Sequence, residues 1–181
     1  MAKKWRIRLS GTGGQGIIKG AMILAEAALI DGRNATQSQV YGPESRGGST
    51  RAEVNISDTR ILYPKVENPN LLLCLSLEAY QKYVGDVSED AIIVLDGNLD
   101  NGALDRPSVY RLPITEIARD QLGKEMAANV VGLGAVNGIA EILSDDSVNE
   151  SLARSFSGKV LDLNLQAYQL GLLAGKAALE K

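Results

Sequence analysis

Apolar and polar residues alternate along residues 5–9 and again along residues 50–57. Alternation with a period of two predicts a β-strand that buries one face and leaves the other open to solvent. In the second stretch Glu53 and Asn55 belong to the polar face, which is therefore expected to be solvated. Residues 60–63 follow after a short turn and are a candidate hairpin partner for this strand.

Two other stretches, residues 71–75 and 91–95, are apolar at every position. Such runs are typical of interior strands that helices cover on both faces. Two further short strands are predicted at residues 34–40 and 109–112.

Apolar residues recur at helical spacing after the first predicted strand. The first helix is expected over residues 14–30, because Asp31 and Gly32 follow the periodic pattern and glycine commonly ends a helix. Further helices are predicted at residues 78–84, 113–122, from 129–138 onward, 147–156 and 161–179.

Two of these helices carry small residues along one face. Gly132, Gly134 and Gly138 lie in one of them, and Gly171 and Gly175 lie one turn apart in the last. Each glycine costs a helix about 1 kcal/mol relative to alanine, so a close contact is expected there. That contact is either packing between helices of this chain or association with another subunit, including a second copy as a homodimer.

The order of the elements predicts the fold class. Strands alternate with helices in the first half and helices dominate the last third, which is typical of a three-layer α/β/α sandwich. The connection between residues 40 and 50 is too short for a crossover helix, so the sheet is expected to be mixed but mostly parallel. No linker or repeat divides the 181 residues, so we expect one domain over residues 1–181.

Composition excludes several classes of function. The net charge is −3 and no basic tract is present, so no nucleic-acid partner is expected. No apolar run is long enough to cross a bilayer and no signal segment is visible, so a cytoplasmic protein without membrane contact is expected. The chain has no histidine and one cysteine, Cys74, whereas a cubane iron–sulfur cluster takes four thiolates. We expect no catalytic residue set, no metal site and no cluster in this chain alone.

A glycine-rich turn joins the first predicted strand to the first helix. Its residues are Gly11, Thr12, Gly13, Gly14, Gln15 and Gly16. Glycines let the backbone approach a ligand closely, and the N-terminus of the following helix presents unpaired N–H groups to an anion. Lys19 could add a full charge. The turn therefore either contacts an anion or cofactor, or only allows a tight strand-to-helix crossover.

The turn does not fit a nicotinamide dinucleotide site. Such a site needs an acidic residue at the end of the second strand, about 20 residues further on. Asp31 lies at that distance but ends the helix, and residues 35–40 contain no acid.

A second segment carries more chemistry than a connector requires. Its candidate contacts are Tyr41, Gly42, Glu44, Ser45, Arg46, Gly47 and Gly48. Arg46 could bind a carboxylate or phosphate in fork geometry, and Glu44 could pair with Arg46 or with a cation of a partner. The alternative is that the segment is only a solvated loop. Asp96, at the end of the strand over 91–95, is either a ligand contact or a plain turn former.

The two glycine-containing segments occur together with the apolar strand at Leu71 and with residues 129–134. This combination closely resembles the gamma subunit of 2-oxoacid:ferredoxin oxidoreductases over nearly the whole chain. The resemblance implies a complex that decarboxylates a 2-oxoacid on thiamine diphosphate and passes electrons through iron–sulfur clusters to ferredoxin. In most members the acyl group is transferred to coenzyme A.

The resemblance also implies a division of labour. Thiamine diphosphate would belong to alpha and beta subunits and the clusters to a ferredoxin-like delta subunit, with ferredoxin as electron acceptor. This chain would bind no cofactor alone and would be inactive in isolation, and its turn and its 41–48 loop would face one cleft on the coenzyme A side. A stand-alone nucleotide- or coenzyme A-binding module is the alternative, and a self-contained dehydrogenase is disfavoured.

Overall fold

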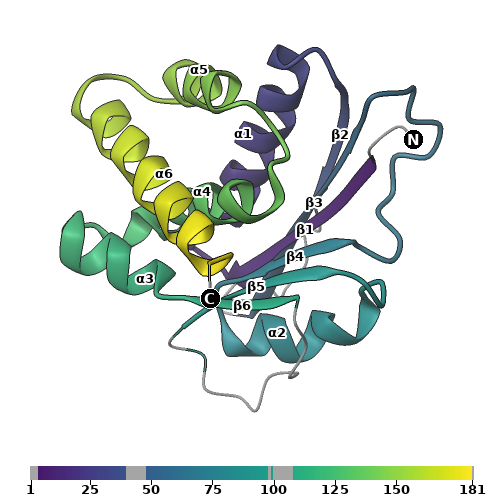
Figure 1. Cartoon of the computed structure of the whole chain (residues 1–181), viewed down its shortest axis with the longest axis horizontal. Coiled ribbons are helices and arrows are strands. Elements are labelled where there is room, and N and C mark those ends of the chain that lie inside the picture. The colour runs from purple at the N-terminus through teal and green to yellow at the C-terminus, as the bar shows by residue number, and fades with distance from the viewer. Residues whose placement is uncertain (1–3, 40–47, 98, 100–107, 181) are drawn as a thin grey trace.

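The computed structural model describes residues 4–39, 48–97, 99 and 108–180, and its strands form a single sheet (Figure 1). Their order across the sheet is β2-β3-β1-β4-β5-β6. The strands are β1 (Lys4–Thr12), β2 (Asn34–Gln39), β3 (Ser49–Ser57), β4 (Leu71–Cys74), β5 (Ile92–Asp96) and β6 (Val109–Leu112). β1, β4, β5 and β6 pair in parallel, while β3 runs antiparallel to both β1 and β2. The predicted mixed, mostly parallel sheet is confirmed.

Helices cover both faces of this sheet (Figure 1). The α2 helix (Leu77–Tyr83) lies on one face and continues into a 3₁₀ turn, η2 (Val84–Asp86). The other helices lie on the opposite face: α1 (Ile17–Ile30), α3 (Ile114–Glu116), α4 (Ala128–Ala140), α5 (Asp145–Ser155) and α6 (Gly158–Ala178). A π-helical segment, η3 (Ile117–Gln121), and a 3₁₀ turn, η4 (Glu125–Ala127), connect α3 to α4. The three-layer prediction is confirmed.

The β4 strand shows why an uninterrupted apolar run marks the centre of the sheet. All four of its residues are buried. Leu71 and Leu73 belong to the larger core under the five helices, and Leu72 and Cys74 belong to the smaller core under α2. Because successive strand residues point to opposite faces, only a continuous apolar run can fill both cores.

The glycine faces of α4 and α6 pack against each other. A Cβ at Gly134 would overlap the Tyr168 carbonyl oxygen, and a Cβ at Gly171 would overlap the Val131 carbonyl oxygen. Every residue of α4 is buried. Of the two interpretations offered for these glycines, packing within the chain is the one that the structure uses.

One predicted strand and one predicted helix start were wrong. Residues 60–63 form no strand, because β3 already has β1 and β2 on its two sides, and Leu62 is 84% exposed. The first helix begins at Ile17 rather than at residue 14, because Gly14 and Gly16 have φ values of +93° and +72° that no α-helix accommodates.

The polar face of β3 is covered, which also differs from the prediction. Glu53 and Asn55 are only 5% and 1% exposed. The Arg8 guanidinium bonds Glu53 through Nε at 2.8 Å and Asp86 through NH1 at 2.8 Å, and Asn55 donates to the Pro64 carbonyl at 2.8 Å. Polar groups are tolerated inside a protein when they are paired in this way.

Candidate functional site

The glycine turn lies where the parallel strands end. The β1 strand continues through Ser10 and Gly11 to Thr12, three residues beyond the predicted strand. The chain then reverses through Gly14 and Gly16, and α1 starts at Ile17. In α/β folds, ligands bind outside the carboxyl ends of the strands, which is where this turn lies.

The N-terminus of α1 keeps donors available. The first N–H groups of a helix have no acceptor inside it. Within the described residues no side chain caps this end, and the N-cap residue Gly16 has left-handed backbone geometry. The donors and the positive end of the helix dipole favour an anion there.

The side chain of Gln15 is bonded within the protein. Its Oε1 accepts from the Thr12 N–H at 2.7 Å, and its Nε2 donates to the Leu75 carbonyl at 3.2 Å, just beyond β4. A Cβ at Gly11 would overlap this Oε1, so the amide could not keep its position beside a larger residue. Gln15 therefore fastens the turn to the end of the neighbouring strand.

The start of α4 reaches the same turn. Asn129, the second residue of α4, donates from Nδ2 to the Gly16 carbonyl oxygen at 3.0 Å. A Cβ on Gly16 would lie 2.6 Å from that nitrogen. Sequence analysis did not assign a role to Asn129, because its partner lies 113 positions earlier in the chain.

The second predicted segment meets the turn at its last residue. Gly48 accepts a hydrogen bond from the Gly13 N–H at 3.3 Å, and the following residue, Ser49, pairs with Thr12 in the sheet. The remaining predicted contacts lie outside the described residues: Tyr41, Gly42, Glu44, Ser45, Arg46 and Gly47. The turn and the end of this segment thus lie at one edge of the sheet.

Two other candidates have structural partners. The Lys19 ammonium lies 5.2 Å from the centre of the Phe156 ring, a cation–π contact with the end of α5. The buried Asp96 carboxylate accepts from the Thr115 hydroxyl and, at 3.4 Å, from the Thr115 N–H. Asp96 thereby satisfies two donors at the start of α3.

Cys74 is buried beneath α2. Its Sγ lies 3.1 Å from the Ser10 hydroxyl. Burial raises the pKa of the thiol to about 12, although the Ser10 hydrogen bond and the Arg8 charge act in the opposite direction. In the part of the chain that the structure describes, no group of three or more His, Cys, Asp or Glu residues could hold a metal ion.

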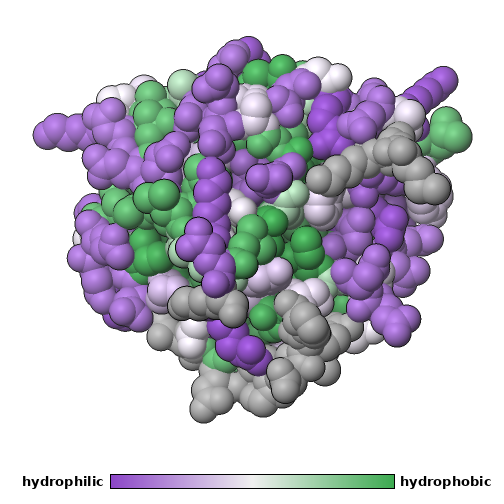
Figure 2. All heavy atoms as spheres, viewed as in Figure 1, coloured by the Kyte–Doolittle hydropathy of each residue, from purple (hydrophilic) through white to green (hydrophobic). Residues whose placement is uncertain are grey.

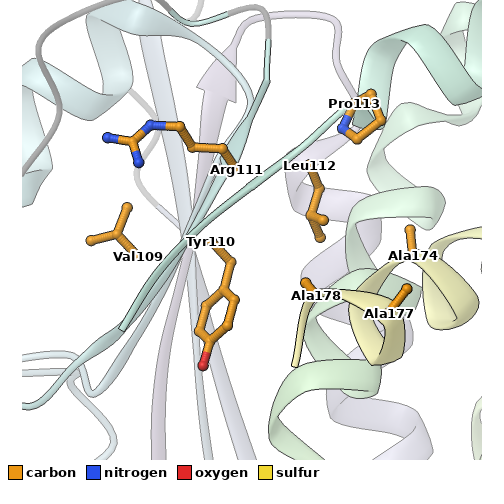
Figure 3. Close-up of a pocket in the computed structure, with 8 residues that line it drawn as sticks. All are labelled: Val109, Tyr110, Arg111, Leu112, Pro113, Ala174, Ala177 and Ala178. Carbon is orange, nitrogen blue, oxygen red and sulfur yellow. The ribbon is translucent and has the colours of Figure 1, made fainter. Parts of the chain in front are cut away.

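A cavity of about 340 Å³ lies elsewhere, between β6 and α6 (Figure 3). Tyr110 and Leu112 of β6 point toward Ala174 and Ala178 of α6. Two strands separate β6 from β1, so this cavity is not part of the glycine turn. Figure 2 shows the molecule from the same side as Figure 1, with many hydrophilic residues on this face and some hydrophobic residues gathered near its middle. Among the described helices, none is both long and apolar enough to cross a membrane.

Comparison with known proteins gives consistent matches over nearly the whole chain. The model of the pyruvate ferredoxin/flavodoxin oxidoreductase family matches residues 6–174. The chain is 40% identical to the 2-oxoglutarate synthase subunit KorC of Methanocaldococcus jannaschii, over 94% of this chain and 93% of that protein.

Solved structures agree in fold. The gamma subunit of a keto/oxoacid ferredoxin oxidoreductase from Geobacter sulfurreducens superimposes with a TM-score of 0.85 at 35% identity, covering 97% of this chain and 98% of that one. A 2-oxoglutarate:ferredoxin oxidoreductase from Magnetococcus marinus has a TM-score of 0.86 at 23% identity, over 97% of this chain and 31% of that longer chain. The chain therefore belongs to the pyruvate ferredoxin/flavodoxin oxidoreductase family, as a gamma-type subunit of a multi-subunit 2-oxoacid:ferredoxin oxidoreductase.

Proposed function

We propose that this subunit forms one wall of the coenzyme A site in a complex that oxidatively decarboxylates a 2-oxoacid to an acyl-CoA. The observation that carries the proposal is the glycine turn, whose helix N-terminus offers backbone donors at the carboxyl edge of the sheet. Coenzyme A carries a pyrophosphate and a further phosphate, and these are the anions that such a turn binds.

Two further points support the proposal. The Magnetococcus marinus relative was solved with 2-oxoglutarate, coenzyme A and succinyl-CoA bound, and it shares this fold. The turn also contains the glycines that a close backbone approach requires. Gly14 is exposed and a Cβ placed on it would meet nothing within 4 Å, so space exists beside the turn.

The proposal assigns the reacting cofactors to other subunits. Thiamine diphosphate would be held by alpha and beta subunits and the iron–sulfur clusters by a ferredoxin-like delta subunit, with ferredoxin as the acceptor. This chain would be one domain, would lie in the cytoplasm and would be inactive alone. Six residues are retained as contacts from the sequence alone: Tyr41, Gly42, Glu44, Ser45, Arg46 and Gly47.

A matched pair of substitutions at Gly14 tests the proposal in the assembled complex. Asn and Asp tolerate a positive φ better than other side chains, so Gly14→Asn and Gly14→Asp share the same backbone strain and differ in charge. A unit charge about 10 Å from a phosphate, at an effective dielectric constant near 20, is worth roughly 1–2 kcal/mol. We expect KM for coenzyme A to be roughly tenfold higher for Gly14→Asp than for Gly14→Asn, with kcat alike.

Equal KM values for the two variants would contradict a coenzyme A site at the turn. The stand-alone binding module predicts a different result, which calorimetry of the isolated chain can detect. Binding of coenzyme A, ADP or NAD tighter than about 10 μM without partner subunits would favour that alternative.

A further inference from the structure

We infer that Asn129 is a positioning residue for the coenzyme A site, because it fixes the peptide unit that directs the first free N–H of α1. This inference rests on the proposed function. It concerns a residue of α4 that lies beneath the turn and is 8% exposed.

The peptide bond between Gly16 and Ile17 is planar. The Gly16 carbonyl and the Ile17 N–H belong to one rigid trans unit, so a hydrogen bond that fixes the carbonyl also fixes the direction of the N–H. Asn129 Nδ2 donates to this carbonyl at 3.0 Å, and the Gly20 N–H of α1 donates to it at 2.9 Å. Two donors from two helices therefore orient the same peptide unit.

The Asn129 bond constrains this peptide unit from outside α1. Gly16 has no side chain and adopts φ +72°, a conformation that glycine enters and leaves easily. Within the described residues α1 has no side-chain cap that could hold its first turn instead. The Asn129 amide also occupies the space where a Cβ of residue 16 would lie, at 2.6 Å. Asn129 therefore acts on the ligand through Gly16 and Ile17.

The test removes this donor without adding charge, in the assembled complex. Asn129→Ala and the bulkier Asn129→Leu both lack the amide, and either of them is sufficient if the other assembles poorly. Asn55→Ala is the matched control, because Asn55 is a buried residue whose Nδ2 donates to the Pro64 carbonyl at 2.8 Å. Asn55 lies opposite Arg6, near the end of the sheet away from the glycine turn. Loss of the Asn55 amide should therefore lower stability without changing the turn.

The assay compares two acyl acceptors, coenzyme A and pantetheine, which has the same thiol arm but no phosphate. For the Asn129 variants we expect KM for coenzyme A to rise roughly tenfold, with kcat at saturation and KM for pantetheine within about twofold of the parent. Calorimetry of coenzyme A binding to the complex should show the same loss. Asn55→Ala should leave both KM values unchanged, although its melting temperature falls.

The outcomes separate the inference from the proposed function. If the Gly14 pair differs in KM for coenzyme A but the Asn129 variants behave like Asn55→Ala, Asn129 is only structural and the inference is overturned. If KM for coenzyme A and for pantetheine rise together, the effect is not on the phosphates and the inference also fails. If the Gly14 pair shows no difference either, the proposed site itself is wrong and the inference is lost with it.

Discussion

At the scale of single residues, the amide of Gln15 shows how the glycine turn is held. Gln15 lies within the predicted glycine turn, yet both ends of its amide bond to the protein, at Thr12 and Leu75. The residues that follow Gln15, at the start of α1, offer backbone N–H donors. At the scale of single residues, the turn is therefore a framework in which side chains hold the backbone and the backbone is available to a ligand.

Cys74 gives a prediction at this scale. Because burial raises its pKa from 9.0 to about 12, the thiol stays protonated in the folded state while the unfolded chain ionises near pH 9. The free energy of unfolding should therefore fall as pH rises from about 9 toward 12, since unfolding then releases a proton. Denaturant titrations of the parent and of Cys74→Ala should show a steeper alkaline loss of stability in the parent. Equal pH profiles would contradict the burial argument.

Sequence alone could find the turn but not the residues that pair from a distance. The spacing of Gly11, Gly14 and Gly16 is local information, and it was sufficient to predict a turn between the first strand and the first helix. The burial of Glu53 depends on Arg8, 45 positions away, and the role of Asn129 depends on Gly16. Such pairs are set by strand order and helix packing, which local periodicity does not contain.

At the scale of elements, α4 and α6 pack with their backbones in direct contact. Their glycines remove side chains where one backbone crosses the other, as shown by Gly134 against Tyr168 and Gly171 against Val131. Helix axes approach this closely only with small residues at the contact. The N-terminus of α4, with Asn129, is held by this packing next to the turn.

We predict that Gly171→Ala destabilises the chain. Its Cβ would overlap the Val131 carbonyl, and a backbone atom cannot move away as a flexible side chain can. Overpacking of this kind costs about 1–3 kcal/mol, more than the roughly 1 kcal/mol that alanine gains in helix propensity. We expect a melting temperature several degrees lower, measured by calorimetry or circular dichroism.

Gly85→Ala is the control for this experiment, because a Cβ at Gly85 would meet nothing within 4 Å. It should change the melting temperature by no more than about one degree. A Gly171→Ala variant as stable as the parent would mean that α6 can move away from α4, and that the glycine face is not required for packing.

Helices and strands were predicted correctly where the apolar pattern along the chain was sufficient. Prediction failed where the neighbouring strands of the sheet decide whether a segment becomes a strand. The interior strands β4 and β5 were predicted correctly because a strand that is covered by helices on both faces needs apolar residues at every position. Residues 60–63 were a candidate hairpin partner for β3, but both sides of β3 are already paired, with β1 and with β2. The glycine faces of the two helices were expected either to pack together or to bind another subunit, and only the three-dimensional structure distinguishes these alternatives.

At the scale of the whole molecule, the arrangement brings one functional edge together from distant parts of the chain. The end of β1, the start of β3, the residue after β4 and the start of α4 meet at the glycine turn. The groups described there include the uncapped N-terminus of α1 and the side-chain amides of Gln15 and Asn129. The proposed coenzyme A contact is placed at these groups.

A structure of the assembled complex with coenzyme A bound would test the central claim most directly. The account predicts a phosphate oxygen of the coenzyme within hydrogen-bond distance of the N–H groups at the start of α1, about 3 Å. A coenzyme whose phosphates bind fully to other subunits, with none in contact with residues 11–17 of this chain, would contradict it.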